Sequence, residues 1–434
     1  MTLALGFLIF AIFAAKSRRL YPFLLVFAAG SEYVGESGAI FSYPRLAIVA
    51  ALIGLLMWHR VTWPPRIFVG RMVLAFAVWM CLSVIWSTFQ QASLLRVNTV
   101  VSLAVQYIII VLYVREPLDM DRFWNAFLIF ASVEAAISLV NLQTGNIFIE
   151  LETSNRTAGL LANPNDSALV SSMGLCVLFI GMLRWRQYKV WYGRPWIIVM
   201  LALVLLGGLL SSGSRSGALA GIAGALSIVW FAWRVPEIRS EFFKKKWIVA
   251  GGAGLGTVIL FPLAMGLVTR FGEVQDDGVG GRQDIFRMFI VQVPESLFIG
   301  RGLNTASTIG EVQTGTALST HNTYITIMLE FGIVGAILCG AVAWSVFRAL
   351  SPGRFGGTHF FFDRVLLLSI VIANVLYAFS ADQLLNKFVW LFIGVIDVAH
   401  GLRRSNDRSL CGLSAVQGRR LPRSGRALPT GSFS

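Results

Sequence analysis

One histidine and a few arginines are the residues of this chain whose type and position could support chemistry. Arg215 lies in the short turn 211–217 between two apolar runs, and Arg156, Arg282 and Arg287 lie in two longer polar segments. Guanidinium groups bind phosphate and pyrophosphate through paired, charge-assisted hydrogen bonds. These arginines therefore predict a phosphate or pyrophosphate site, unless they only pair with acidic residues of their own loops.

His321 stands at the start of an apolar run in which glycine recurs. At about 100° per residue, Gly332 and Gly335 share a helix face with His321, and Tyr324 joins that face. Small residues in such a row let a neighbouring helix come close. We therefore expect His321 at the mouth of a tightly packed seam, where its imidazole could accept a proton.

The same run carries Glu330, which falls on the opposite helix face from His321 and about 13 Å deeper by helix rise. An intramembrane carboxyl needs a partner, so we expect Glu330 to make a structural hydrogen bond. Ser319 or Thr320 is the expected N-cap of this helix.

The remaining polar residues suggest no further reaction centre. His59, His359 and His400 lie at the ends of apolar runs, and the four cysteines lack the spacing of a disulfide or a zinc site. The chain has no glycine-rich phosphate loop with a lysine and no carboxylate cluster suited to Mg²⁺. The sequence therefore predicts chemistry that uses no metal, no cofactor and no ATP.

The elements that must position these residues are membrane helices. The chain has 434 residues, of which 56% are apolar and 13% are charged, with a mean hydropathy of +0.71. Soluble domains carry about 25% charged residues, so this composition excludes a soluble enzyme, a disordered chain and a disulfide-rich secreted domain. We predict an all-α polytopic integral membrane protein with about 12 or 13 transmembrane helices, because backbone polar groups in lipid must be paired within each segment. The expected spans are residues 2–15, 20–35, 42–58, 67–86, 95–114, 122–141, 166–183, 195–211, 216–233, 247–268, 322–347, 362–380 and 384–400.

The basic residues are distributed unevenly among the loops, and this sets the expected orientation. Most of the 36 Lys and Arg residues lie in alternate loops and in the C-terminal tail, which the positive-inside rule assigns to the cytoplasm. The net charge of +14 therefore requires no nucleic-acid partner. Residues 1–400 are expected to form the transmembrane bundle, with loops 142–165 and 269–321 on its periplasmic, active-site face. Residues 401–434 are expected to form a disordered cytoplasmic tail.

Three shorter segments have patterns of their own. Residues 284–291 have the pattern of an amphipathic helix at the membrane surface, which Pro294 would end. Residues 163–165, Asn-Pro-Asn, have turn chemistry directly before a span. The first apolar run is followed, and not preceded, by basic residues, so we expect a retained span and no cleaved signal peptide.

Several of these residues together resemble a known family. His321-Asn322, then nine residues, Gly332, two residues and Gly335 form a pattern similar to a motif of bacterial O-antigen ligases. A resemblance to the wider O-antigen ligase and polymerase superfamily extends to three further features, namely the turn 214–217, the segment 156–165 and the large loop before the histidine. The resemblance covers roughly residues 150–350.

This resemblance implies a metal-independent, inverting glycosyltransferase of the bacterial inner membrane, with its active site facing the periplasm. The donor would be a glycan on undecaprenyl pyrophosphate. Arg215 and Arg282 would bind the pyrophosphate and stabilise the charge that builds as it leaves, and His321 would act as general base or orient the acceptor hydroxyl. The further residues expected to bind substrate are Arg287 (which competes with Arg282), Arg156, Asn322, Tyr324 and Asn165.

Other functions compete with this one. A ligase passes the glycan to lipid A–core, whereas a polymerase passes it to another repeat of O-antigen or exopolysaccharide, and the histidine motif favours the ligase. A small-anion transporter could use outside arginines together with Glu134 and Glu330, but the chain has no inverted repeat and no matching pair of broken helices. A membrane scaffold or assembly partner is the remaining alternative.

Overall fold

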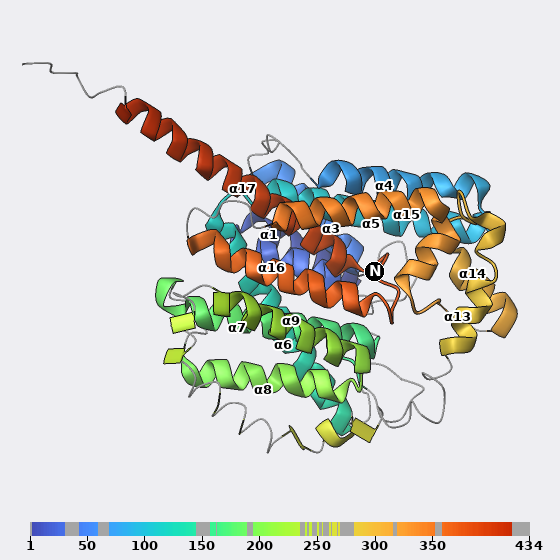
Figure 1. Ribbon diagram of the computed structural model, residues 1–434, viewed down its shortest axis with the longest axis horizontal. Coiled ribbons are helices and arrows are strands. Elements are labelled where there is room, and N and C mark those ends of the chain that lie inside the picture. Colours follow the sequence, from blue (N-terminus) through green and yellow to red (C-terminus); the bar gives the residue numbers. More distant parts are fainter. Residues whose placement is uncertain are drawn as a thin grey trace, which may run out of the picture.

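The computed structural model describes residues 2–30, 43–59, 69–144, 157–161, 163–188, 194–234, 282–315, 319–351 and 358–418, with short stretches between 239 and 269. All regular structure in these residues is helical (Figure 1). The expected all-α fold is therefore confirmed.

The helices follow the apolar runs of the sequence. In chain order they are α1 (Thr2–Lys16), α2 (Tyr21–Gly30), α3 (Tyr43–Trp58), α4 (Gly70–Leu82), α5 (Gln90–Tyr113), α6 (Pro117–Thr144), α7 (Pro164–Tyr188), α8 (Pro195–Ser211), α9 (Arg215–Arg234), α13 (Arg282–Ile290), α14 (Thr305–Thr314), α15 (Thr323–Leu350), α16 (Thr358–Tyr377) and α17 (Lys387–Gly418). Short 3₁₀ turns span Ser83–Trp86 and Pro294–Ser296. Each expected span coincides with one of these helices, apart from 247–268, which lies mostly outside the described residues.

Helix length and composition identify a polytopic membrane protein. Among the described residues, 4 helices are long and apolar enough to cross a membrane, namely Gln90–Tyr113, Pro117–Thr144, Pro164–Arg184 and Thr323–Leu350. Shorter apolar helices of 10–17 residues accompany them in the part of the chain that is described. Most of the long helices run side by side across the view of Figure 1, with α13 and α14 at one end. The number of crossings stays a prediction.

The described turns between the helices lie at two opposite ends of the bundle. At one end, Thr323 donates its backbone N–H to the Ala378 carbonyl at 2.9 Å, and we call this the His321 end. At the other end, Arg184 contacts Asp363 at 2.8 Å, and we call it the Arg184 end.

A row of small residues positions α9 against α7. A Cβ atom added at Gly217 would lie 2.3 Å from the Cβ atom of Ala168, and one at Gly221 would lie 2.7 Å from the Ser172 hydroxyl. Only glycine allows so close an approach of the two backbones. Because both rows run in the same direction, α7 and α9 are parallel and their first turns lie together at the His321 end.

Aromatic rings fill the space between α6 and α17. The rings of Phe127 and Phe392 are 5.2 Å apart, and those of Phe127 and Phe388 are 5.8 Å apart. These side chains are at most 2% exposed. This packing holds the start of α17, and with it the preceding turn, in a fixed place.

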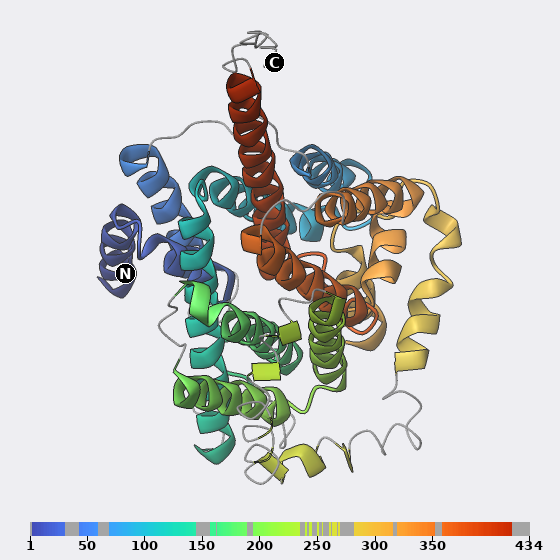
Figure 2. The ribbon, with the colours of Figure 1, turned by 60° about the vertical axis from the view of Figure 1, so that its left-hand side comes forward.

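Two segments can be compared with their expected boundaries. The amphipathic segment 284–291 is helical as α13, which begins two residues earlier at Arg282. By contrast, α17 continues to Gly418 and projects beyond the bundle (Figure 2). The first part of the tail that we expected to be disordered is thus helical, because a helix that has already formed gains one hydrogen bond for each residue it adds.

Candidate active site at the His321 end

Arg215 is the first residue of α9 and follows a tight turn. The Ser214 hydroxyl accepts the backbone N–H of Gly217 at 3.1 Å, and the Ser214 carbonyl accepts that of Ala218 at 3.0 Å. Ser214 is therefore the N-cap of the helix. The Arg215 side chain is partly buried and stands at the positive end of the helix dipole, where anions are favoured.

The packing of α9 against α16 fixes how far along the bundle axis Arg215 lies. The hydroxyl of Ser227 donates to that of Ser369 at 2.7 Å. Arg215 lies twelve residues before Ser227, or about 18 Å along the helix, whereas Tyr377 ends α16 about 12 Å beyond Ser369. Since the two helices are antiparallel, Arg215 lies level with residues 378–386, which we call the α16–α17 turn.

His321 lies two residues before α15 and adopts an unusual backbone conformation. Its φ angle is +50°, in the left-handed region that non-glycine residues seldom occupy. Its Nδ1 atom lies 3.5 Å from the Ser319 hydroxyl, and the side chain is partly buried. Such backbone strain is common at functional sites, and here it turns the chain sharply before the helix begins.

Asn322 and Tyr324 have contacts within the protein. The Asn322 side chain accepts the N–H groups of Tyr324 and Ile325 at 2.9 and 3.1 Å and donates to the Phe379 carbonyl at 3.2 Å. The Tyr324 hydroxyl donates to the Val375 carbonyl at 3.2 Å. Asn322 is therefore the N-cap of α15, and the expectation that Ser319 or Thr320 caps it is wrong. Substrate binding by Asn322 and Tyr324 stays a prediction.

The α16–α17 turn joins the helix of His321 to the first turn of α7. The hydroxyl of Thr323 donates to the Ala381 carbonyl and accepts the backbone N–H of Gln383, both at 2.8 Å. The Gln383 side chain in turn donates to the Asp166 carboxylate at 3.4 Å. The turn therefore lies between His321 on one side and α7, with its partner α9, on the other.

Asp166 is a site residue that the sequence did not single out. Its Oδ1 atom accepts from the Tyr377 hydroxyl at 3.3 Å, and from the side-chain amides of Gln383 and Asn386 at 3.4 Å each. Asn165, which we predicted to bind substrate, is its neighbour in the first turn of α7. The only available signal was an acidic residue in the first turn of a helix, which is common.

Asp382 adds a carboxyl group on the α15 side of the same turn. It accepts the Thr326 hydroxyl at 3.2 Å and the backbone N–H of Leu384 at 3.1 Å. Burial raises the pKa of Asp382 above its ordinary value, while these two hydrogen bonds oppose the shift. The site thus holds carboxyl groups on both sides of the turn.

Gly332 does not form the expected seam between two straight helices. Its φ angle is +61°, and α15 is broken there. Arg301 and Gly302 donate their N–H groups to the Leu329 and Glu330 carbonyls at 2.8 and 2.9 Å. The segment 297–302 thus approaches α15 in place of a helix, and the straight-helix geometry of the prediction fails because the break rotates one half of α15 against the other.

Glu330 has the structural role that we expected. The carboxylate is 4% exposed and accepts the backbone N–H of Ala306 at 3.0 Å, in the first turn of α14. An oxygen acceptor at a helix N-terminus pairs a backbone N–H group that has no partner within the helix. Glu330 therefore fixes α14 above the break of α15.

The other predicted arginines lie outside this central group. Arg287 is exposed on α13, whose Phe289 is fully buried in a cluster with Leu329 of α15. Arg282 begins α13, but its side chain lies outside the described residues, as does Arg156 altogether. The structure thus brings Asn165, Arg215, His321, Asn322 and Tyr324 to one end of the bundle and packs the helix of Arg282 and Arg287 against α15.

One protein family matches part of this chain. Residues 200–340 match the O-antigen ligase family. This match, which covers about a third of the chain, supports the resemblance to the O-antigen ligase and polymerase superfamily. The matched segment includes Arg215, Arg282, Arg287 and His321 and ends before the α16–α17 turn. No curated protein matches the chain.

A match to this family indicates an enzyme of the membrane glycosyltransferase type, with lipid-linked glycan and polysaccharide or lipid A–core as substrates in general. In the described residues, no group of three or more His, Cys, Asp or Glu side chains is arranged to hold a metal ion. That the reaction needs no metal stays a prediction.

Proposed function

We propose that this protein transfers a glycan from undecaprenyl pyrophosphate to an acceptor hydroxyl at the His321 end, which faces the periplasm. We favour lipid A–core as the acceptor, which makes the protein an O-antigen ligase of the bacterial inner membrane. The observation that carries the proposal is the position of Arg215 and His321 on either side of the α16–α17 turn. A cation and a base are thereby held at one end of a lipid-accessible helix bundle.

Arg215 supplies the binding site for the leaving group. A guanidinium can hold two phosphate oxygens at once, and the first turn of α9 adds the partial positive charge of the helix dipole. Negative charge grows on the pyrophosphate as the bond to the sugar breaks, so this site stabilises the transition state more than the ground state. Arg282 or Arg287 of α13 is the proposed second cation, and Arg156 a further donor contact.

His321 serves the acceptor. Its imidazole takes the proton of the acceptor hydroxyl while the hydroxyl oxygen bonds to C1 of the sugar. The bond between C1 and the pyrophosphate oxygen breaks at the same time, and undecaprenyl pyrophosphate leaves with the electron pair. Attack comes from the face opposite the leaving group, so the anomeric configuration inverts. Asn165, Asn322 and Tyr324 border this space.

The packing of α15 disfavours an anion transporter. Broken membrane helices often mark a transport path, and α15 is broken at Gly332. However, the Ile333 and Val334 N–H groups donate to the Leu297 and Phe298 carbonyls at 2.8 and 3.2 Å. The backbone groups freed by the break are thus paired with the protein and do not line an open path.

The test uses purified full-length protein in detergent with a glycan on undecaprenyl pyrophosphate, and the products are separated on a gel. With lipid A–core present, we expect one shift of that acceptor, which identifies a ligase. A ladder of longer lipid-linked glycans without lipid A–core would identify a polymerase instead. No product with either acceptor, across several donor sugars, would contradict glycosyl transfer and favour the transporter.

Two controls accompany this assay. Activity that persists in excess chelator is expected, and its loss would contradict the metal-independent reaction. The anomeric configuration of the new linkage, read by NMR, should be opposite to that of the donor.

A further inference from the structure

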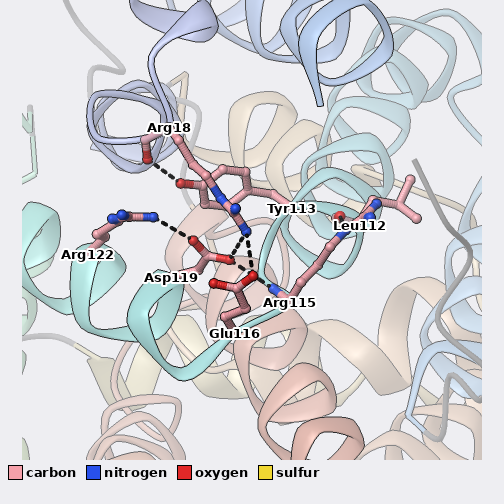
Figure 3. Close-up of polar contacts among 7 residues, drawn as sticks. All are labelled: Arg18, Leu112, Tyr113, Arg115, Glu116, Asp119 and Arg122. Atoms are coloured by element: carbon pink, nitrogen blue, oxygen red, sulfur yellow. Dashed lines mark hydrogen bonds and ion pairs between the residues drawn. The ribbon is translucent and has the colours of Figure 1, made fainter. Parts of the chain in front are cut away.

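A cluster of arginines at the Arg184 end has no role in the proposed reaction. It joins the turn between α1 and α2 to the turn between α5 and α6 (Figure 3). At its centre, the Asp119 side chain is fully buried and accepts from the guanidinium groups of Arg18 and Arg122, both at 2.9 Å. The backbone N–H of Arg115 adds a third hydrogen bond at 3.2 Å. Both oxygens of the Asp119 carboxylate thus accept hydrogen bonds from the protein itself.

The cluster keeps an excess of positive charge after these contacts. Among the described residues, the cluster contains three guanidinium groups and two carboxylates, the second of which is Glu116, 3.6 Å from Arg18. Arg115 forms no ion pair with a described residue. Its Nε atom donates to the Leu112 carbonyl at 3.0 Å, and one terminal nitrogen is buried without a hydrogen-bond partner.

Burial and the nearby charge of Arg18 lower the pKa of Arg115. The nearby charge of Asp119 acts in the opposite direction but does not cancel the shift. An anion that accepts a hydrogen bond from the Arg115 guanidinium would supply the missing negative charge and acceptor. Hydrogen bonds between charged groups are the strongest in proteins. Lys16 and Arg19, both exposed, add further positive charge beside Arg18.

Apolar side chains stand next to the same arginines. Leu20 is 46% exposed and Leu118 is 52% exposed, and they follow Arg18 and Arg115 by two and three residues. A bilayer covers such side chains with acyl chains, while the arginines stay at the level of the headgroups. Cation and apolar surface together fit a phospholipid better than free phosphate.

We propose that Arg18 and Arg115 form a binding site for the phosphate of an anionic phospholipid in the cytoplasmic leaflet, such as phosphatidylglycerol. Basic pockets between helix ends on this side of a membrane suit such headgroups. The bound lipid links the α1–α2 turn to the α5–α6 turn, at the end of the bundle opposite to His321. This site is independent of the proposed transfer reaction.

The test is native mass spectrometry of the full-length protein with equal amounts of phosphatidylglycerol and phosphatidylcholine. We expect the wild type to retain phosphatidylglycerol in preference, and Arg115→Gln to reduce that preference about fivefold, which corresponds to ~1 kcal/mol per cation near the surface. Arg18→Gln should act in the same direction. Arg115→Lys keeps the charge and should retain most of the preference, which distinguishes lost binding from misfolding.

Arg71→Gln is the matched control, because Arg71 is exposed in the first turn of α4 and lies outside the cluster. Equal retention of both lipids by the wild type, or an equal loss of preference in Arg71→Gln and Arg115→Gln, would overturn the proposal. Inorganic phosphate is the second probe. If it stabilised the wild type but not Arg115→Gln, with no preference among lipids, the site would take free phosphate and the lipid would be excluded.

Discussion

The hydroxyl of Thr323 accepts the backbone N–H of Gln383 at 2.8 Å. The same hydroxyl donates to the Ala381 carbonyl at 2.8 Å. Thr323 follows His321 by two residues, and the Gln383 side chain reaches Asp166 at the start of α7. One threonine therefore holds the helix of the proposed base against the turn that separates it from Arg215.

Replacement of this hydroxyl tests that relationship. Thr323→Val keeps the shape but leaves the Gln383 N–H and the Ala381 carbonyl without their partner, and each unpaired buried group costs about 1–3 kcal/mol. We expect a lower melting temperature and a lower kcat, because the turn and His321 are no longer held together. Thr323→Ser should restore both. A Val variant with unchanged kcat would show that the turn does not position His321.

The assigned roles of His321 and Arg215 make distinct predictions for glycan transfer. His321→Ala should lower the transfer rate about 10²–10⁴-fold, the usual contribution of a general base. Arg215→Ala should lower it about 10²–10³-fold through lost stabilisation of the leaving group. Gel assays of purified variants measure both.

His59→Ala is the control for these variants, because His59 contacts the Ala15 carbonyl at 3.0 Å, away from the site. It should retain activity. Full activity in both His321→Ala and Arg215→Ala would refute the site assignment. Circular dichroism and size-exclusion profiles like those of the wild type establish that the inactive variants still fold.

The sequence predicted the membrane helices well because their signal is strong. A span must be long, apolar and free of unpaired charge, and runs such as 95–114 and 322–347 meet these conditions without reference to their neighbours. The structural role of Glu330 also followed from a local rule, since a carboxyl in an apolar run needs a partner. The identity of that partner, the first turn of α14, depends on the fold.

The details of the site were harder to predict because they depend on tertiary contacts. The break at Gly332 depends on the segment 297–302, which pairs the backbone groups that the break frees. A helical wheel of α15 alone gives no information about that segment. Likewise, Asn322 caps α15 because the left-handed conformation of His321 turns the chain there. Asp166 carries no distinctive motif, and its importance appears only when the α16–α17 turn folds against α7.

Gly332 offers a test of the broken helix. An alanine there would place its Cβ atom 2.5 Å from the carbonyl of Phe298, at a φ of +61°. Strain of this kind costs about 1–3 kcal/mol before the clash is counted. We expect Gly332→Ala to lower the melting temperature and the yield of folded protein.

Gly340 lies on the same helix, and a Cβ atom there would meet nothing within 4 Å. Gly340→Ala should therefore leave stability unchanged or raise it by up to about 1 kcal/mol, because alanine favours the helix. Equal effects of the two substitutions in a thermal melt would contradict the special role of Gly332.

Asp382 gives the pH dependence of stability a definite sign. Because burial raises the pKa of this carboxyl in the folded protein, the folded state favours the protonated form. Its contribution to the free energy of unfolding is present below the ordinary pKa of aspartate and is lost as the pH rises through the raised value.

We expect Asp382→Asn, which keeps an oxygen to accept the Leu384 N–H, to flatten this decline. Melting temperatures of detergent-solubilised protein from pH 4 to 8 measure this decline, with Asp284→Asn as a matched substitution of an exposed aspartate. The opposite result would be a wild-type stability that rises with pH across this range, and the loss of that rise in Asp382→Asn. It would show that the carboxylate is stabilised, not destabilised, by its place beside Thr326.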